Sequence, residues 1–192
     1  MANGNHTMNR RTAHIIGWLC MGWLICSPVL SAQIRMTKDD ALKHYFPGAS
    51  IERRTAFLTA EQVEAIQTRA NARVESRVLT YYVAHDDTSI VGTAFFETQT
   101  VRTMPATYVT VINPDTTLRL VEILGFFEPE DYLPPRGWLA QFNGVQPDDD
   151  LYLKRGIRNI AGATMTAQTL TDGIRRLRAT YEIVVAQKVD SQ

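Results

Sequence analysis

Hydrophobic side chains recur at helical spacing near the C-terminal end of the chain, and four of them fall on one face of a helix: Leu170, Ile174, Leu177 and Tyr181. Thr166 precedes this face and is predicted to be the N-cap of the helix, because its hydroxyl can accept from a free N–H of the first turn. Two shorter helices are predicted over residues 38–46 and 60–72. The second opens with Thr-Ala-Glu-Gln, the sequence of a capping box.

The middle third of the chain has the composition of a sheet. Residues 78–84 and 90–98 are rich in β-forming side chains and are joined by Asp-Asp-Thr, while residues 106–112 and 118–126 are joined by Asn-Pro-Asp-Thr. Residues 50–57 are expected to be extended as well. Short turns between consecutive strands predict antiparallel pairing. Because the helices gather at the two ends of the chain, we predict an α+β fold, an antiparallel sheet flanked by N- and C-terminal helices in a single domain.

Residues 1–32 are predicted to be a signal peptide. Arg10 and Arg11 form a basic region, residues 15–26 are apolar, and small residues at 31–32 suit cleavage. The alternative is an uncleaved anchor, although its apolar core is shorter than the roughly 18 residues that span a bilayer. Either interpretation predicts that residues 33–192 function in the periplasm or at the outer face of the cytoplasmic membrane.

Once residues 1–32 are set aside, the remaining residues lack the side chains that several kinds of chemistry require. Both cysteines, Cys20 and Cys26, lie within it, so disulfides, iron–sulfur clusters and thiol catalysis are excluded for residues 33–192. Only His44 and His85 remain as histidines there, without a partner at ligand spacing. No metal site is therefore expected.

Charge and motifs exclude further classes. The whole chain carries 20 basic and 20 acidic residues, and removal of the two arginines of residues 1–32 leaves 18 basic against 20 acidic, a net charge of −2. No basic stripe suited to a nucleic acid remains. No Rossmann glycine fingerprint, P-loop or hydrolase Gly-x-Ser-x-Gly occurs, so neither a dinucleotide fold nor serine hydrolysis is predicted.

Residues 161–166, Ala-Gly-Ala-Thr-Met-Thr, have a composition suited to binding a phosphate. Three small residues let another molecule approach the backbone, and the hydroxyls lie where a helix with free N–H groups begins. The same composition also caps helices and forms tight turns in proteins that bind nothing.

Residues 160–166 closely resemble the Ser/Thr-Gly-Ala-Thr-x-Thr/Ser signature of the FMN-binding domain family. This family includes flavoprotein subunits of the sodium-pumping NADH:quinone oxidoreductase and of the Rnf complex. Residues 138–144, Trp-Leu-Ala-Gln-Phe-Asn-Gly, resemble a second stretch that the family has about twenty residues earlier. Glu128 and Pro129 are a looser counterpart of a preceding loop. The resemblance covers roughly residues 78–185, so residues 33–192 are expected to form one FMN-binding domain.

The resemblance implies FMN as cofactor and an electron carrier or redox subunit rather than a stand-alone enzyme. A flavin transferase would join FMN to Thr164 through a phosphoester, and membrane or periplasmic redox proteins would exchange electrons with it. Tyr132, Trp138 and Phe142 could provide an apolar slot for the ring, and Lys154, Arg155 or Arg158 a positive charge. The cofactor-binding residues expected are Thr164, Gly162, Ala163, Thr166, Ala161, Met165, Trp138, Tyr132, Glu128 and Arg158.

Two positions depart from the family pattern and keep alternatives open. The family usually has Asp six residues before the modified threonine and Ser or Thr three before it, where this chain has Arg158 and Ala161. The alternatives are a regulatory module that binds FMN or another ligand non-covalently, and a cofactor-free interaction domain. Structural interpretations also compete at single residues: Trp138 and Phe142 as core residues of one helical face, Lys154 and Arg155 as an exposed turn, and Glu128, Glu130 and Asp131 as a solvated acidic loop rather than glycosidase carboxylates.

Overall fold

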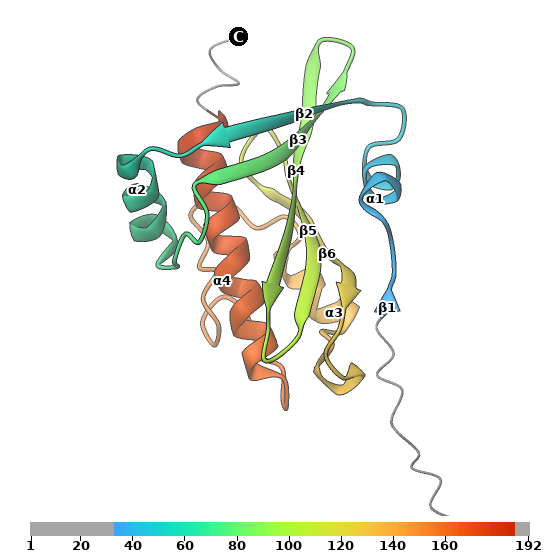
Figure 1. The fold of residues 1–192 in the computed structure, drawn as a ribbon, viewed down its shortest axis with the longest axis vertical. Coiled ribbons are helices and arrows are strands. Elements are labelled where there is room, and N and C mark those ends of the chain that lie inside the picture. The colour runs from blue at the N-terminus through green and yellow to red at the C-terminus, as the bar shows by residue number, and fades with distance from the viewer. Residues whose placement is uncertain (1–32, 187–192) are drawn as a thin grey trace, which may run out of the picture.

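Six antiparallel strands form one sheet in the computed structural model of the chain, which describes residues 33–186. Their order is β1-β6-β5-β4-β3-β2, so that five strands follow one another as a meander and the short β1 lies beside β6 (Figure 1). The elements are β1 (Gln33–Ile34), α1 (Lys38–Tyr45), β2 (Ser50–Phe57), α2 (Ala60–Ala70), β3 (Val78–Asp86), β4 (Ser89–Thr100), β5 (Pro105–Ile112), β6 (Leu118–Phe126), the turn η1 (Glu130–Tyr132), α3 (Arg136–Leu139), the turn η2 (Ala140–Phe142), α4 (Thr164–Thr180) and the π-helical turn η3 (Tyr181–Val185).

The predicted α+β class is confirmed, and the strands lie where the sequence predicts them. The two-residue β1 was not predicted, because it is too short to show a periodic pattern. Its residues Gln33 and Ile34 pair with Phe126 and Gly125 at the far end of the meander. The signal-peptide prediction for residues 1–32 lies outside the part of the chain that is described here. Within residues 33–186, no helix has both the length and the apolar character that crossing a membrane requires.

The two helices near the N-terminal end begin with threonine caps. Thr37 Oγ1 accepts from the Asp40 N–H at 3.2 Å at the start of α1. The predicted capping box of α2 is confirmed, with Thr59 Oγ1 accepting from the Gln62 N–H and Gln62 Oε1 accepting from the Thr59 N–H. Each cap satisfies backbone donors that the first turn of a helix leaves free.

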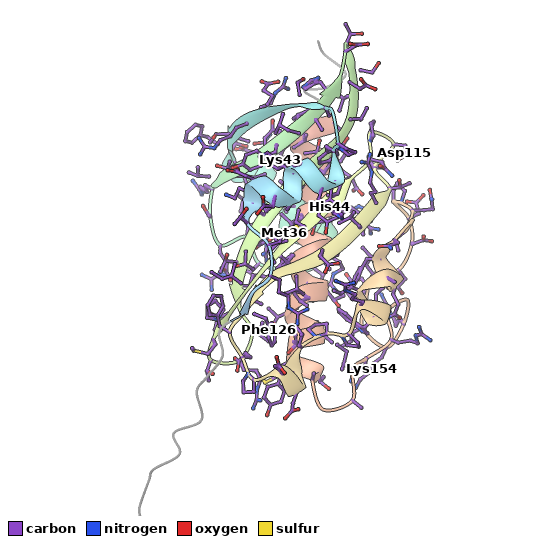
Figure 2. The ribbon with its side chains drawn as sticks, turned by 90° about the vertical axis from the view of Figure 1, so that its right-hand side faces the viewer. Met36, Lys43, His44, Asp115, Phe126 and Lys154 are labelled. Atoms are coloured by element: carbon purple, nitrogen blue, oxygen red, sulfur yellow. The ribbon has the colours of Figure 1, made fainter. Side chains whose placement is uncertain are left out.

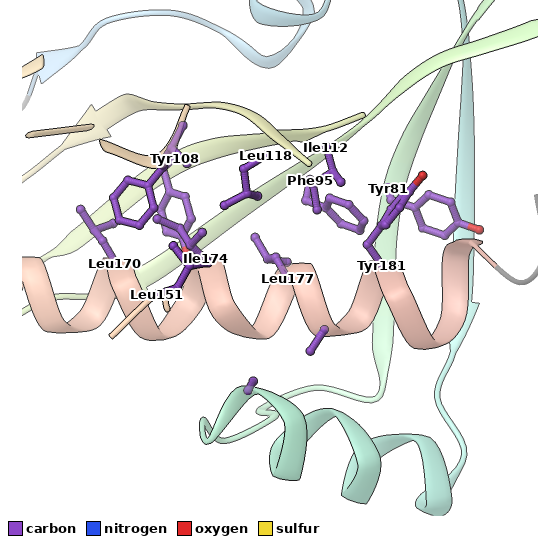
Figure 3. Packing of buried hydrophobic residues seen from close by; sticks show 14 of the residues in the cluster. Tyr81, Phe95, Tyr108, Ile112, Leu118, Leu151, Leu170, Ile174, Leu177 and Tyr181 are labelled. Carbon is purple, nitrogen blue, oxygen red and sulfur yellow. The ribbon is translucent and has the colours of Figure 1, made fainter. Parts of the chain in front are cut away.

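The main hydrophobic core lies between α4 and one face of the sheet (Figure 3). The four apolar residues that predicted the helical face are all buried there, three in α4 and the last at the start of η3, with Tyr108, Leu118 and Phe95 opposite them. Gly173 allows this close approach, since a Cβ atom at that position would collide with Tyr108 Oη and Gln99 Oε1. The helix α2 packs against α4 on the side away from the sheet, as Figure 3 shows.

The opposite face of the sheet is covered by α1 (Figure 2). Leu42 and Phe46 pack there against Ala94, Val109 and Leu124 in a second, smaller cluster. Because α1 connects β1 to β2, the strands at the two edges of the sheet, this connection crosses the whole sheet. The sheet therefore lies between α1 on one face and α4 on the other.

Three buried arginines of α4 fix the segments around it, namely Arg175, Arg176 and Arg178. Arg175 donates to the backbone carbonyls of Ala70 at 2.8 Å and of Leu151 and Asn71 at 3.3 Å. Arg178 donates to the carbonyls of Gln146 and Asp149. These contacts hold the end of α2 and the loop that leads toward residues 161–166.

Candidate functional site

The helix α4 begins at Thr164, so the prediction that Thr166 is its N-cap is wrong. Gly162 adopts φ +80°, and the Ala163 N–H donates to the Ile160 carbonyl in the turn before the helix. Thr166 precedes the buried Leu170 by one helical turn, so its side chain lies on the core face and is buried. A hydroxyl residue before an apolar face fits an N-cap or a first-turn position equally well, which is why the sequence alone did not separate them.

The first turn of α4 has free backbone donors. Unlike α1 and α2, it has no side-chain cap, since Ala163 occupies the N-cap position. No acceptor among residues 33–186 receives the N–H groups of Thr164, Met165 or Thr166. These groups and the helix dipole produce positive potential at this end of α4.

The Thr164 hydroxyl lies at this same end and is exposed. Its Oγ1 accepts a hydrogen bond from Asn159 Nδ2 at 2.9 Å. Gly162 is exposed too, and no atom lies within 4 Å of the place where its Cβ would be. The neighbouring Met165 is 55% exposed. In contrast, Thr166 Oγ1 is buried and has no partner in the described part of the chain.

The first of the two stretches that carry the family resemblance contacts Arg158, which lies two residues before the second. Trp138 Nε1 donates to the Arg158 carbonyl at 2.5 Å. Gln141 Oε1 accepts from both the Arg158 N–H and Arg158 Nε, at 3.0 and 3.1 Å. We refer to the contacts of Trp138 and Gln141 with Arg158 as the clamp. It fixes the backbone six residues before Thr164.

The interpretation of Trp138 and Phe142 as core residues is confirmed. Trp138 is 5% exposed and Phe142 is completely buried, and their ring centroids lie 5.3 Å apart in an edge-to-face contact. The two residues lie one helical turn apart and both face the core. An open slot formed by these two rings is therefore not present, and the polar contribution of Trp138 is its N–H group.

Glu128 is buried, so the interpretation of residues 128–131 as a solvated acidic loop is wrong at this position. Its Oε1 accepts from three successive backbone N–H groups, those of Arg102, Thr103 and Met104, at 3.1, 2.6 and 2.8 Å. Burial alone would raise the pKa of this carboxyl, but the backbone donors outweigh it and the pKa is lowered. The carboxylate is thus engaged in holding the β4–β5 turn.

Tyr132 is half-buried beneath the exposed Arg102, whose guanidinium lies 4.0 Å from the ring centroid. Figure 1 shows the β4–β5 turn and the start of α4 at the same end of the molecule. Glu130 and Asp131 are exposed, as an acidic loop predicts.

The basic residues before Thr164 have different environments. Arg155 forms an ion pair with Asp150, with 2.8 Å between Nε and Oδ2, in the exposed turn that the structural interpretation predicted. Lys154 is exposed with φ +65°. Arg158 is exposed and bound to Gln141.

Two polar residues of this region were not among the predicted site residues. Gln141 lies three residues after Trp138, and this helical spacing could have suggested a shared partner. Asn159 lies five residues before Thr164 and carried no such signal.

Comparison with known proteins finds no family model that matches the chain and no curated protein that matches it.

Proposed function

We propose that residues 33–192 form an FMN-binding electron-transfer domain in which FMN is linked to Thr164 through a phosphoester. The observation that carries this proposal is the exposed Thr164 hydroxyl at the uncapped start of α4. A phosphate at this position would lie among free N–H groups and at the positive end of a 17-residue helix. The chemistry of the donors fits the phosphate end of FMN.

Each residue of the site has a separate task in this proposal. Thr164 Oγ1 provides the oxygen of the ester, and Asn159 orients it by donating to it. The N–H groups of Met165 and Thr166 bind phosphate oxygens, so Thr166 acts through its backbone rather than its hydroxyl. Gly162 and Ala163 leave room for the ligand, while the clamp fixes the preceding loop. When bound, FMN supplies one- and two-electron transfer.

The cellular setting is part of the same proposal. The domain would act on the outer side of the cytoplasmic membrane, where a flavin transferase attaches FMN and redox proteins exchange electrons with it. Arg158 and Ala161, which replace the family's usual Asp and hydroxyl residues, favour a second candidate, a domain that binds FMN without a covalent bond. The side chain of Arg158 is bound by Gln141, an arrangement that the usual aspartate could not form in the same way.

Production of the full chain together with a flavin transferase tests the proposal. We expect a yellow protein that keeps flavin fluorescence on a denaturing gel, and a peptide containing Thr164 heavier by FMN minus water. Thr164→Ala should remove the label and leave the fold intact, as measured by circular dichroism, whereas Thr164→Ser should keep it. Thr100→Ala, another exposed threonine, is the matched control.

The other outcomes separate the candidates. Colour that disappears on denaturation supports non-covalent binding, and a colourless protein supports a cofactor-free interaction domain. Covalent flavin that persists in Thr164→Ala would contradict the assignment of the attachment residue.

A further inference from the structure

A hollow of about 400 Å³ lies between α1 and the β2–β3 pair, on the sheet face opposite α4. It is larger than two other hollows of about 300 and 290 Å³ and falls within the range of about 300–1,000 Å³ typical of small-molecule sites. None of these three hollows is lined by residues 161–166. The hollow under α1 is therefore separate from the candidate flavin site.

The walls of this hollow are mainly apolar. Leu42 of α1 and Phe46 at its C-cap are buried, Tyr82 of β3 is half-buried, and Ile51 of β2 is 36% exposed. Covering an exposed isoleucine with an apolar group is favourable, because it removes apolar surface from water. By contrast, the hollow of about 300 Å³ beside α4 is lined by arginines and acids whose polar groups bind one another.

Two cations at this hollow have no carboxylate partner. Lys43 of α1 and Arg53 of β2 are exposed, and neither forms an ion pair with any residue that the structure describes. Figure 2 shows Lys43 on the helix that covers this face. Lys38 adds a third cation, with its ammonium nitrogen 5.4 Å from the ring centroid of Tyr82. Asp39 is the single carboxylate of the lining against Lys43 and Arg53, so the lining carries a formal net charge of +1.

We propose that the apolar hollow flanked by Lys43 and Arg53 binds a small amphipathic carboxylate. Its aliphatic body would cover Ile51 and contact Leu42 and Phe46, and its carboxylate would lie between the two cations. Both parts are needed, because an exposed ion pair alone contributes little and an apolar body alone leaves the cations unpaired. This site is independent of the flavin proposal.

Calorimetric titration of the full chain with octanoate, below its micellar concentration, tests the proposal. We expect octanoate to bind more tightly than 1-octanol, which lacks the charge, acetate, which lacks the body, and octylammonium, which has the opposite charge. Octanoate should also shift the methyl NMR signals of Leu42 and Ile51. The double variant Lys43→Glu, Arg53→Glu should weaken octanoate at least about tenfold and leave 1-octanol nearly unchanged.

Arg77→Glu reverses one positive charge at an exposed position outside the hollow and should bind octanoate like the wild type. Circular dichroism establishes that each variant is folded, and Thr164→Ala should bind octanoate normally. Equal binding of octanoate and octylammonium, or methyl shifts confined to other residues, would overturn the proposal. Binding to phosphatidylglycerol vesicles without any affinity for free octanoate would overturn it as well, because the face would then recognise a lipid surface.

Discussion

A single buried carboxylate organises the turn between β4 and β5, at the end of the molecule that also holds the candidate site. Glu128 follows β6, yet its oxygen binds three backbone N–H groups of the turn between β4 and β5. Such donors in a tight turn form a concave site for an anion, and here the chain supplies its own anion. The acidic residues next to Glu128 in the sequence predicted a solvated loop. Its partners lie 24 to 26 residues away, and because they are backbone N–H groups no residue type in the sequence indicates them.

Replacement of this carboxylate should change the response of the protein to acid. The pKa of Glu128 is lowered in the folded state, so its stabilisation is present above the unfolded value of about 4.3 and is lost as the pH falls through the folded pKa. Glu128→Gln should lower the free energy of unfolding at neutral pH by about 1–2 kcal/mol. It should also lose less stability than the wild type between neutral pH and about pH 3.

Urea denaturation at several pH values measures both effects. Asp131→Asn, an exposed neighbour, should stay within about 0.5 kcal/mol of the wild type at neutral pH. A variant of Glu128 with the same acid sensitivity as the wild type would contradict the role given to its ionised form.

Elements with a clear periodic pattern were predicted from the sequence, and the contacts between them were not. The apolar face of α4 and the alternating strands each have a period that burial imposes on local sequence. The start of α4 is different, because Thr166 belongs to the core face while also resembling a cap. The clamp joins residues that are 17 and 20 positions apart in the sequence. Helix and strand periodicity does not predict contacts over that separation.

The clamp should be measurable as local order. Trp138→Phe removes the donor to the Arg158 carbonyl while keeping an aromatic ring in the core, and Gln141→Leu removes the acceptor. We expect faster hydrogen exchange over residues 158–163 in both variants, with a global loss of about 1–2 kcal/mol. If Thr164 carries FMN, flavin loading should fall as well.

Gln146→Leu is the matched control, because this exposed glutamine donates to the Gly144 carbonyl outside the clamp. Exchange over residues 158–163 that stays at the wild-type rate in the two clamp variants would show that other contacts position this loop.

The domain has two hydrophobic clusters, and polar contacts made by α4 hold it together in addition to them. The Arg175 side chain bonds both to the C-terminal end of α2 and to the Leu151 carbonyl. Its guanidinium also lies 4.0 Å from the Tyr152 ring centroid. Burial of a charged side chain is tolerated because the carbonyls and Asp172 satisfy its donors.

Loss of this linkage should destabilise the entire domain. Arg175→Met keeps an apolar stem but leaves several buried carbonyls without donors, so we expect a loss of about 3 kcal/mol in the free energy of unfolding. Arg155→Met removes an exposed ion pair of an arginine that also lies over the Tyr152 ring, and it should cost less than about 1 kcal/mol. Equal losses in the two variants, measured by urea denaturation, would contradict the importance of burial at Arg175.

The pairing of β1 with β6 also has a consequence for the order of folding. Gln33 pairs with Phe126, so this edge pairing of the sheet joins the start of the domain to a residue far along the chain. Contacts of such long separation slow folding, because the loop between them must lose its freedom first. The sheet cannot be completed during synthesis until residue 126 has emerged from the ribosome.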